Sequence, residues 1–188
     1  MLKILEDSSF FQLLQSSDED TCKALKANGC LRCGGKLDAG HFHRKPRGIE
    51  WAALNINSTL RFSLCCREEG CRKRVLPLSL RFAGRKVYCS LFIVLFALLR
   101  ERGDRKAQLF LQTKFQLSLT TAHRWLRLFK VKLSTSLWAR DMGSLGVFLK
   151  HQSNLLSAFY ESINIELSLS DRWIKILAGL HSLWPQLL

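Results

Sequence analysis

The sequence predicts an α+β protein that is mostly α-helical, with one small β subdomain. Two groups of cysteines, within residues 30–33 and 65–71, lie about thirty residues apart beside short alternating segments typical of strands. Amphipathic patterns with helical spacing fill most of the remaining chain. The net charge of +14 is gathered in the middle, where residues 30–86 carry +9 and residues 87–132 carry +7. These three observations together favour a basic, cysteine-held β unit followed by helices.

The two cysteine groups predict one tetrahedral zinc site in a zinc ribbon. Thiolates are soft anionic ligands that suit Zn²⁺, and each close pair can reach the metal from one tight turn. Glycines accompany both groups, where such turns need backbone freedom. Side chains alternate along a strand, so Cys65 and Cys66 point to opposite faces, and Cys66 is on the face expected to be apolar. The predicted ligands are Cys30, Cys33, Cys66 and Cys71, with Cys65 as the alternative to Cys66.

A disulfide framework and unrelated buried thiols are the other interpretations of these cysteines. Disulfides suit small secreted domains, and the first residues lack the basic start, apolar middle and cleavage site of a secretory signal. The longest apolar run, residues 87–99, is shorter than the roughly 20 residues that cross a bilayer. We therefore expect a cytoplasmic, nucleoid-associated protein with reduced thiols. Cys22 and Cys89 are expected to be small buried hydrophobes.

Changes in charge and pattern divide the chain into four segments. These are an N-terminal helical segment (1–29), the ribbon (30–86), a buried helix with a helix-turn-helix (87–132) and a C-terminal helical region (133–188). The outer two segments carry −2 and 0, so the positive excess lies entirely in the inner two. Charge gathered in this way indicates a polyanion partner, most often nucleic acid.

The first segment predicts amphipathic helices with a turn or cap at residues 16–18. Asp18, Glu19 and Asp20 then precede lysines, as the helix dipole favours, and the acidic group is expected to be a solvated helix N-terminus. Asn28-Gly29 predicts the end of that helix. Residues 87–99, apolar on every side, predict a buried helix.

Two cationic groups accompany the cysteines. The first lies on a turn fixed by Pro46, and the second follows Cys71, so both are suited to phosphate. The predicted phosphate contacts are Arg44, Lys45, Arg47, Arg72, Lys73 and Arg74. His41 and His43 are alternative metal ligands, although with four cysteines placed they are more simply surface or phosphate-contacting groups.

Residues 104–131 predict a helix-turn-helix. Asp104 can cap a helix over 105–114, residues 115–118 form a short connection, and a second helix begins at Leu119. On that second helix, Leu119, Ala122, Leu126 and Phe129 share an apolar face. The opposite, basic face is suited to the major groove of DNA. The predicted groove and phosphate contacts are Thr120, Thr121, His123, Arg124, Arg127 and Lys130.

The last segment predicts a helix from Leu145 to about Ile163 and another that opens at a Ser168–Asp171 capping box and ends near Pro185. Trp173, Leu177, Leu180 and Trp184 form one apolar stripe along that last helix. Core packing is the default interpretation of such a stripe, and a face for a partner protein is the alternative.

The order of cysteine knuckle, Gly-Gly, basic turn, Leu-Arg-Phe-Ser-Leu-Cys-Cys, Gly-Cys-Arg-Lys-Arg and Thr-Thr-Ala-His-Arg-Trp resembles the N-terminal DNA-binding region of insertion-sequence transposases. It is also similar to short proteins carried near mobile elements. The resemblance covers residues 30–131 and implies a zinc ribbon, a helix-turn-helix and DNA binding. The acidic ribonuclease-H-like domain of those transposases has no counterpart after residue 133, so the resemblance implies no strand transfer.

The sequence thus predicts a non-enzymatic, zinc-containing protein that binds double-stranded DNA in a mobile-element or regulatory role. One rival is a zinc-stabilised adaptor that binds a partner protein through its C-terminal helices. The other is a zinc nuclease, because Gly40-His-Phe-His43 beside a cysteine pair is weakly similar to His-Asn-His nucleases. The oligomeric state is left open.

Overall fold

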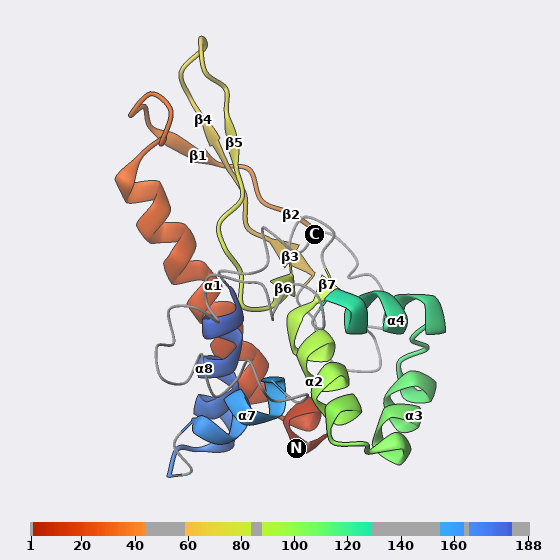
Figure 1. The fold of residues 1–188 in the computed structure, drawn as a ribbon. Coiled ribbons are helices and arrows are strands. Elements are labelled where there is room, and N and C mark those ends of the chain that lie inside the picture. Colours follow the sequence, from red (N-terminus) through yellow and green to blue (C-terminus); the bar gives the residue numbers. More distant parts are fainter. Residues whose placement is uncertain (1, 44–58, 84–87, 129–154, 164–165, 182–188) are drawn as a thin grey trace.

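The computed structural model describes residues 2–43, 59–83, 88–128, 155–163 and 166–181 (Figure 1). Within them the protein is an α+β fold that is mostly helical, as predicted. The helices are η1 (Leu2–Glu6), α1 (Ser8–Asn28), α2 (Ser90–Glu101), α3 (Arg105–Lys114), α4 (Leu119–Leu128), α7 (Leu155–Ser162) and α8 (Leu169–His181). The strands are β1 (Leu37–Ala39), β2 (Phe42–His43), β3 (Leu60–Arg61), β4 (Leu64–Cys66), β5 (Arg74–Val75), β6 (Phe82–Ala83) and β7 (Tyr88–Cys89). None of the helices in these ranges is both long and apolar enough to span a membrane.

Helix α1 is continuous, and the turn predicted at residues 16–18 is wrong. The carboxylate of Asp7 caps the helix by accepting from the N–H groups of Ser9 and Phe10, at 3.0 and 3.2 Å. The helix ends at Gly29, as predicted, with φ of +79°. Ser16, Ser17 and Asp18 therefore all lie inside the helix. Asp18 does not cap the local backbone, because its carboxylate accepts hydrogen bonds from residues that are distant in the sequence.

Two ladders form one long antiparallel ribbon. Leu37 to Ala39 pair with Leu64 to Cys66, and Phe42 and His43 pair with Arg61 and Leu60, in one continuing register. Strand β5 extends the first ladder into a sheet of order β1-β4-β5. The stretch that leads to Cys66 forms two strands, β3 and β4, joined by Phe62 and Ser63. Because the register does not slip, Arg61, Ser63 and Cys65 are on one face of this ribbon.

The apolar side chains of the described residues form two clusters. The larger is built around α2, whose residues from Ser90 to Leu99 are all buried, against η1, the start of α1, and α3, α4, α7 and α8. The predicted buried helix is thus confirmed, although it begins at Ser90 because Tyr88 and Cys89 pair with β6. The smaller cluster lies against the end of α1 and contains Cys22, Cys30, Leu37, Phe62, Leu64 and Cys66.

Helices α3 and α4 form the predicted helix pair. Asp104 caps α3 by accepting from the N–H of Ala107 at 3.0 Å, and residues 115–118 form the short connection. The predicted apolar face of α4 is partly wrong, because Leu119 is 66% exposed while Trp125 is buried. The indole packs edge-on against Tyr88, with ring centroids 5.8 Å apart. Phe129 lies outside the described residues.

The last two described helices pack on α2. The carboxylate of Glu101, at the end of α2, accepts from the N–H groups of Leu156 and Ser157, at 3.2 and 2.7 Å. The predicted capping box is confirmed, since the Asp171 N–H donates to Ser168 Oγ and that hydroxyl donates to the Asp171 carboxylate. Trp173, Leu177 and Leu180 are fully buried, so this stripe is part of the core. Trp184 and most of the predicted helix 145–163 lie outside the described ranges.

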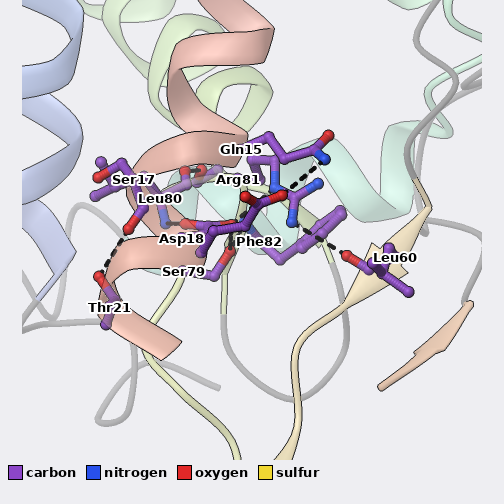
Figure 2. A network of polar contacts seen from close by, with 11 residues as sticks. Gln15, Ser17, Asp18, Thr21, Leu60, Ser79, Leu80, Arg81 and Phe82 are labelled. Atoms are coloured by element: carbon purple, nitrogen blue, oxygen red, sulfur yellow. Dashed lines mark hydrogen bonds and ion pairs between the residues drawn. The ribbon is translucent and has the colours of Figure 1, made fainter. Parts of the chain in front are cut away.

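The acidic group of α1 is not a solvated N-terminus: Asp18 is buried in mid-helix at the junction of the two clusters (Figure 2). Its carboxylate accepts from Ser79 Oγ at 2.5 Å, the Leu80 N–H at 2.6 Å and Arg81 Nε at 2.8 Å. The Arg81 guanidinium also donates to the carbonyl oxygen of Leu60 in β3, at 3.1 Å. The Asp18 and Arg81 side chains are only 2% and 3% exposed. This network joins α1, the segment before β6, and the long ribbon.

Asp18→Ala should lower the free energy of unfolding by about 3–5 kcal/mol, because it leaves the Arg81 charge buried without its carboxylate. Urea unfolding followed by circular dichroism measures the change. Asp20→Ala on the same helix is the matched control, since that side chain is 70% exposed, and should change stability by less than about 0.5 kcal/mol. Equal effects of the two substitutions would contradict a structural role for the ion pair. Combining Asp18→Leu with Arg81→Met should recover much of the loss.

Candidate metal centre

The first pair of candidate ligands lies on a tight turn between α1 and β1. The Cys30 N–H donates to the Gly35 carbonyl at 2.9 Å, and the Gly34 N–H donates to the Cys30 carbonyl at 2.7 Å. Gly34 has φ of +71°, which L side chains rarely adopt. Gly29 before the turn has φ of +79°, and a Cβ there would lie 3.0 Å from the Gly34 carbonyl oxygen. These bonds hold the Cys30 and Cys33 side chains on one side of the turn.

The second pair closes the hairpin between β4 and β5. Cys66 is the last residue of β4, and the N–H groups of Cys71 and Arg72 both donate to the Glu68 carbonyl at 2.9 Å. Arg72 has φ of +42°, so the residue after the last cysteine is left-handed here, as Gly34 is after Cys33. The Cys66 N–H also donates to the Lys73 carbonyl at 2.9 Å. The two turns therefore present their cysteines with related backbone shapes.

The four predicted ligands, Cys30, Cys33, Cys66 and Cys71, meet in one cluster. Their Sγ atoms all lie within 4.8 Å of one another. The Cys30–Cys71 and Cys33–Cys66 sulfur distances are 3.7 and 3.4 Å. A tetrahedron with metal–sulfur bonds of about 2.3 Å has sulfur–sulfur edges of about 3.8 Å, close to these distances. A disulfide would need about 2.05 Å, and all seven cysteines are free. The arrangement can hold a metal ion in an all-thiolate site.

Two of the thiols differ in how readily they ionise. The backbone N–H groups of Arg32 and Cys33 lower the pKa of Cys30 to about 7, since they stabilise the thiolate. Burial raises the pKa of Cys66 to about 12. Without metal, Cys66 therefore keeps its proton at neutral pH. A metal ion bound here would displace that proton, which is the usual coupling between metal binding and proton release.

The alternative ligands lie outside the cluster. Cys65 Sγ is 3.7 Å from the carbonyl oxygens of Cys66 and Arg72, on the opposite face from Cys66, as predicted. His41 Nδ1 lies 3.1 Å from the Ser63 carbonyl oxygen and 3.2 Å from its nitrogen. His43 Nδ1 lies 3.0 Å from the Thr59 hydroxyl. Among the described residues the structure has one group of three or more candidate metal ligands, and it is the four-cysteine group.

The predicted nucleic-acid contacts fall on two exposed regions. Arg72, Lys73 and Arg74 are exposed beside the metal cluster, at the end of the molecule where Figure 1 shows the β4–β5 hairpin extending beyond the helices. On α4, Thr121 is half-buried and the other described contacts are exposed: Thr120, His123, Arg124 and Arg127. Arg124 also donates to the Tyr88 hydroxyl at 3.5 Å. Arg44, Lys45, Arg47 and Lys130 lie outside the described residues.

Sequence reasoning missed the buried ion pair that positions the ribbon. The signal was present, because Phe10, Leu14, Asp18 and Cys22 recur every four residues and so lie on one helix face. An acidic residue within an apolar stripe indicates a buried partner. Arg81, between Leu80 and Phe82, was the corresponding basic residue.

Comparison of the chain with models of protein families, with curated proteins and with solved structures finds no match.

Cys33→Ser should abolish stoichiometric metal binding, because it removes one of the four thiolates. Metal content after purification in the presence of zinc, and the melting profile, check this. Cys65→Ser is the matched control and should retain the metal, since that sulfur points away from the cluster. Retained metal and an unchanged melting profile in Cys33→Ser would eliminate the four-cysteine site.

Gly29→Ala should destabilise the metal-loaded protein by about 1–3 kcal/mol, because a side chain is strained at this φ and meets the Gly34 carbonyl oxygen. Gly70→Ala is the control, since a Cβ at Gly70 meets nothing within 4 Å. Chelator competition and thermal melting of the two variants measure the difference. If Gly29→Ala holds metal and melts as Gly70→Ala does, the first turn does not depend on its glycine.

Proposed function

We propose that this chain is a zinc-containing DNA-binding protein that is not catalytic by itself. One observation carries the proposal: two thiols of the four-cysteine cluster, Cys66 and Cys71, share one hairpin with three exposed cations, because Arg72, Lys73 and Arg74 follow Cys71 directly. A metal ion bound to Cys66 and Cys71 would therefore fix the cations as well as the cysteines. Charges that only keep a protein soluble do not need to be fixed in position beside a metal site.

Zinc is the metal best suited to this cluster. Tetrahedral all-sulfur sites select zinc or iron, and zinc is the usual ion in closed structural sites of this kind. The three-stranded sheet β1-β4-β5, with one cysteine turn before β1 and the other between β4 and β5, supports the interpretation of this subdomain as a zinc ribbon. The cluster of apolar residues around it is small, so metal binding would supply much of its folding free energy.

DNA is the polyanion that the two exposed regions fit best. The hairpin cations would neutralise phosphates, which positions a protein without reading sequence. Helix α4 would enter the major groove, with Thr120, Thr121 and His123 near base edges and the later arginines at phosphates. Burial of Ala122 and Trp125 against α2 and β7 supports this orientation, because it directs the basic face of α4 outward.

A role beside mobile genetic elements rests on the resemblance of residues 30–131 to transposase DNA-binding regions. In that role the protein would recognise DNA, while another protein supplies the chemistry. The partner could dock on the exposed apolar residues of the helix pair, Leu109, Phe110 and Leu119.

The two rival functions have less support. A nuclease would need a catalytic metal beside His41, whereas the one group of candidate metal ligands among the described residues is the four-cysteine cluster, which does not include it. An adaptor that binds through the C-terminal stripe would need Trp173 and Leu177 at the surface, and both are buried. Metal-dependent DNA cleavage lost in His41→Ala would bring the nuclease forward again.

Affinity for duplex DNA should fall roughly a thousandfold between 50 and 200 mM salt, as six or more phosphate contacts imply. Fluorescence anisotropy across a salt series measures it, with and without prior chelation of the metal. The combined substitution of Arg72, Lys73 and Arg74 by Gln should reduce the slope of log K against log salt by about 3. Lys175→Gln, an exposed change on α8, should leave the slope unchanged. No binding to DNA in any of these conditions would refute the proposal.

A further inference from the structure

A second arginine is buried next to the Asp18–Arg81 pair. Arg61 is the last residue of β3, opposite Phe42 of β2, and is only 5% exposed. Its guanidinium carbon lies 5.7 Å from the centre of the Phe82 ring. The Arg81 guanidinium carbon lies 5.0 Å from the same ring. Two cations therefore share one aromatic ring in the interior.

The local carboxylate is already used by Arg81. Both oxygens of Asp18 are engaged, one by the Leu80 N–H and the other by Ser79 and Arg81. Among the described residues, no carboxylate lies within ion-pair distance of Arg61, and no hydrogen bond to its guanidinium is found. The described interior thus contains two arginines and one aspartate, an excess of one positive charge.

This excess charge is costly. Burial lowers the pKa of Arg61, although Asp18 opposes the change and Arg81 adds to it. Cation–π contact offsets only part of the cost of removing a guanidinium from water. Ser63, on the same ribbon face as Arg61, is fully buried, and its hydroxyl also has no hydrogen-bond partner among the described residues. Arg61 and Ser63 thus share a ribbon face, and among the described residues neither side chain has a hydrogen-bond partner.

We propose that Arg61 binds an anion of the phosphate class, with the Ser63 hydroxyl as a second donor on the same face. Arginine suits this ligand because its planar fork donates two parallel hydrogen bonds to phosphate oxygens. The anion would compensate the unbalanced charge that the described residues leave beside Arg81.

The phosphate has two sources, a free ion or the backbone of a bound nucleic acid. The second source rests on the proposed function. It is favoured by position, because Figure 1 shows β2 and β3 between the β1-β4-β5 sheet and helix α4, the elements that carry the two exposed basic regions.

Inorganic phosphate should raise the Tm of the wild-type protein more than chloride does at equal ionic strength, and the excess should grow with the logarithm of phosphate concentration. In Arg61→Met this excess should disappear, corresponding to at least tenfold weaker phosphate binding. Arg105→Met, an exposed change at the start of α3 with no assigned binding role, is the control and should keep it. General stabilisation by excluded phosphate acts on all three proteins alike and so cancels.

Arg61→Met should fold, because it replaces an unbalanced buried charge by an apolar side chain of similar length. If it does not fold, Arg61→Lys keeps the charge without the fork and should still reduce the phosphate response. Equal phosphate responses in wild type and in the Arg61 variant, or no excess over chloride in wild type, would overturn the inference.

The salt dependence of DNA binding distinguishes a free phosphate ion from a backbone phosphate. If the ligand is a backbone phosphate, Arg61→Met should reduce the salt slope for DNA binding by about 1. An unchanged slope with a lost phosphate response supports the site and assigns it to free phosphate. If the protein binds no DNA at all, the proposed function fails, whereas the phosphate arm still decides the role of Arg61.

Discussion

The buried pair of Asp18 and Arg81 is the interaction on which the arrangement of the described fold depends. It lies where the two apolar clusters meet; the carboxylate joins α1 to the segment of residues 79–81, and the Arg81 guanidinium joins that segment to the long ribbon (Figure 2). Ion pairs in low dielectric are stable only when nearly every donor and acceptor is satisfied. The Ser79 hydroxyl, the Leu80 N–H and the Leu60 carbonyl complete this set. Apolar packing alone would tolerate several orientations of the ribbon on α1, whereas this network specifies one.

The part of the molecule around the four cysteines has little apolar surface of its own to bury. Its cluster includes two of the four candidate ligands, Cys30 and Cys66, so the sulfurs are part of the packing as well as of the site. The backbone does the rest of the positioning, through left-handed residues after Cys33 and Cys71. Since one of these is Arg72 rather than glycine, the second turn stores some backbone strain that a bound metal would hold in place.

Local rules predicted much of this structure because local interactions decide those parts. Cysteine spacing with strand alternation identified the four converging thiols, and cap chemistry identified Asp104, Gly29 and Ser168. Burial was harder to predict where tertiary partners decide it. Leu119 was expected to be buried, and Trp125 was not assigned to the core. In the structure α4 is rotated so that Trp125 packs against Tyr88, a contact that the pattern within the helix does not reveal. Asp18 was expected to be solvated, whereas it is buried, because its partners come from segments that are distant in the sequence.

Helix α1 contributes side chains to both apolar clusters, and this determines how the protein can unfold locally. Its first turns pack Phe10 and Leu14 into the large cluster, whereas Cys22, near its other end, packs beside the thiols. Asp18 marks the boundary between these two cooperative units. Local opening of the thiol-containing half can therefore unravel α1 from its C-terminal end and stop there, leaving the earlier turns folded. Amide hydrogens on the two sides of Asp18 should therefore exchange with solvent at different rates, although they lie on one unbroken helix.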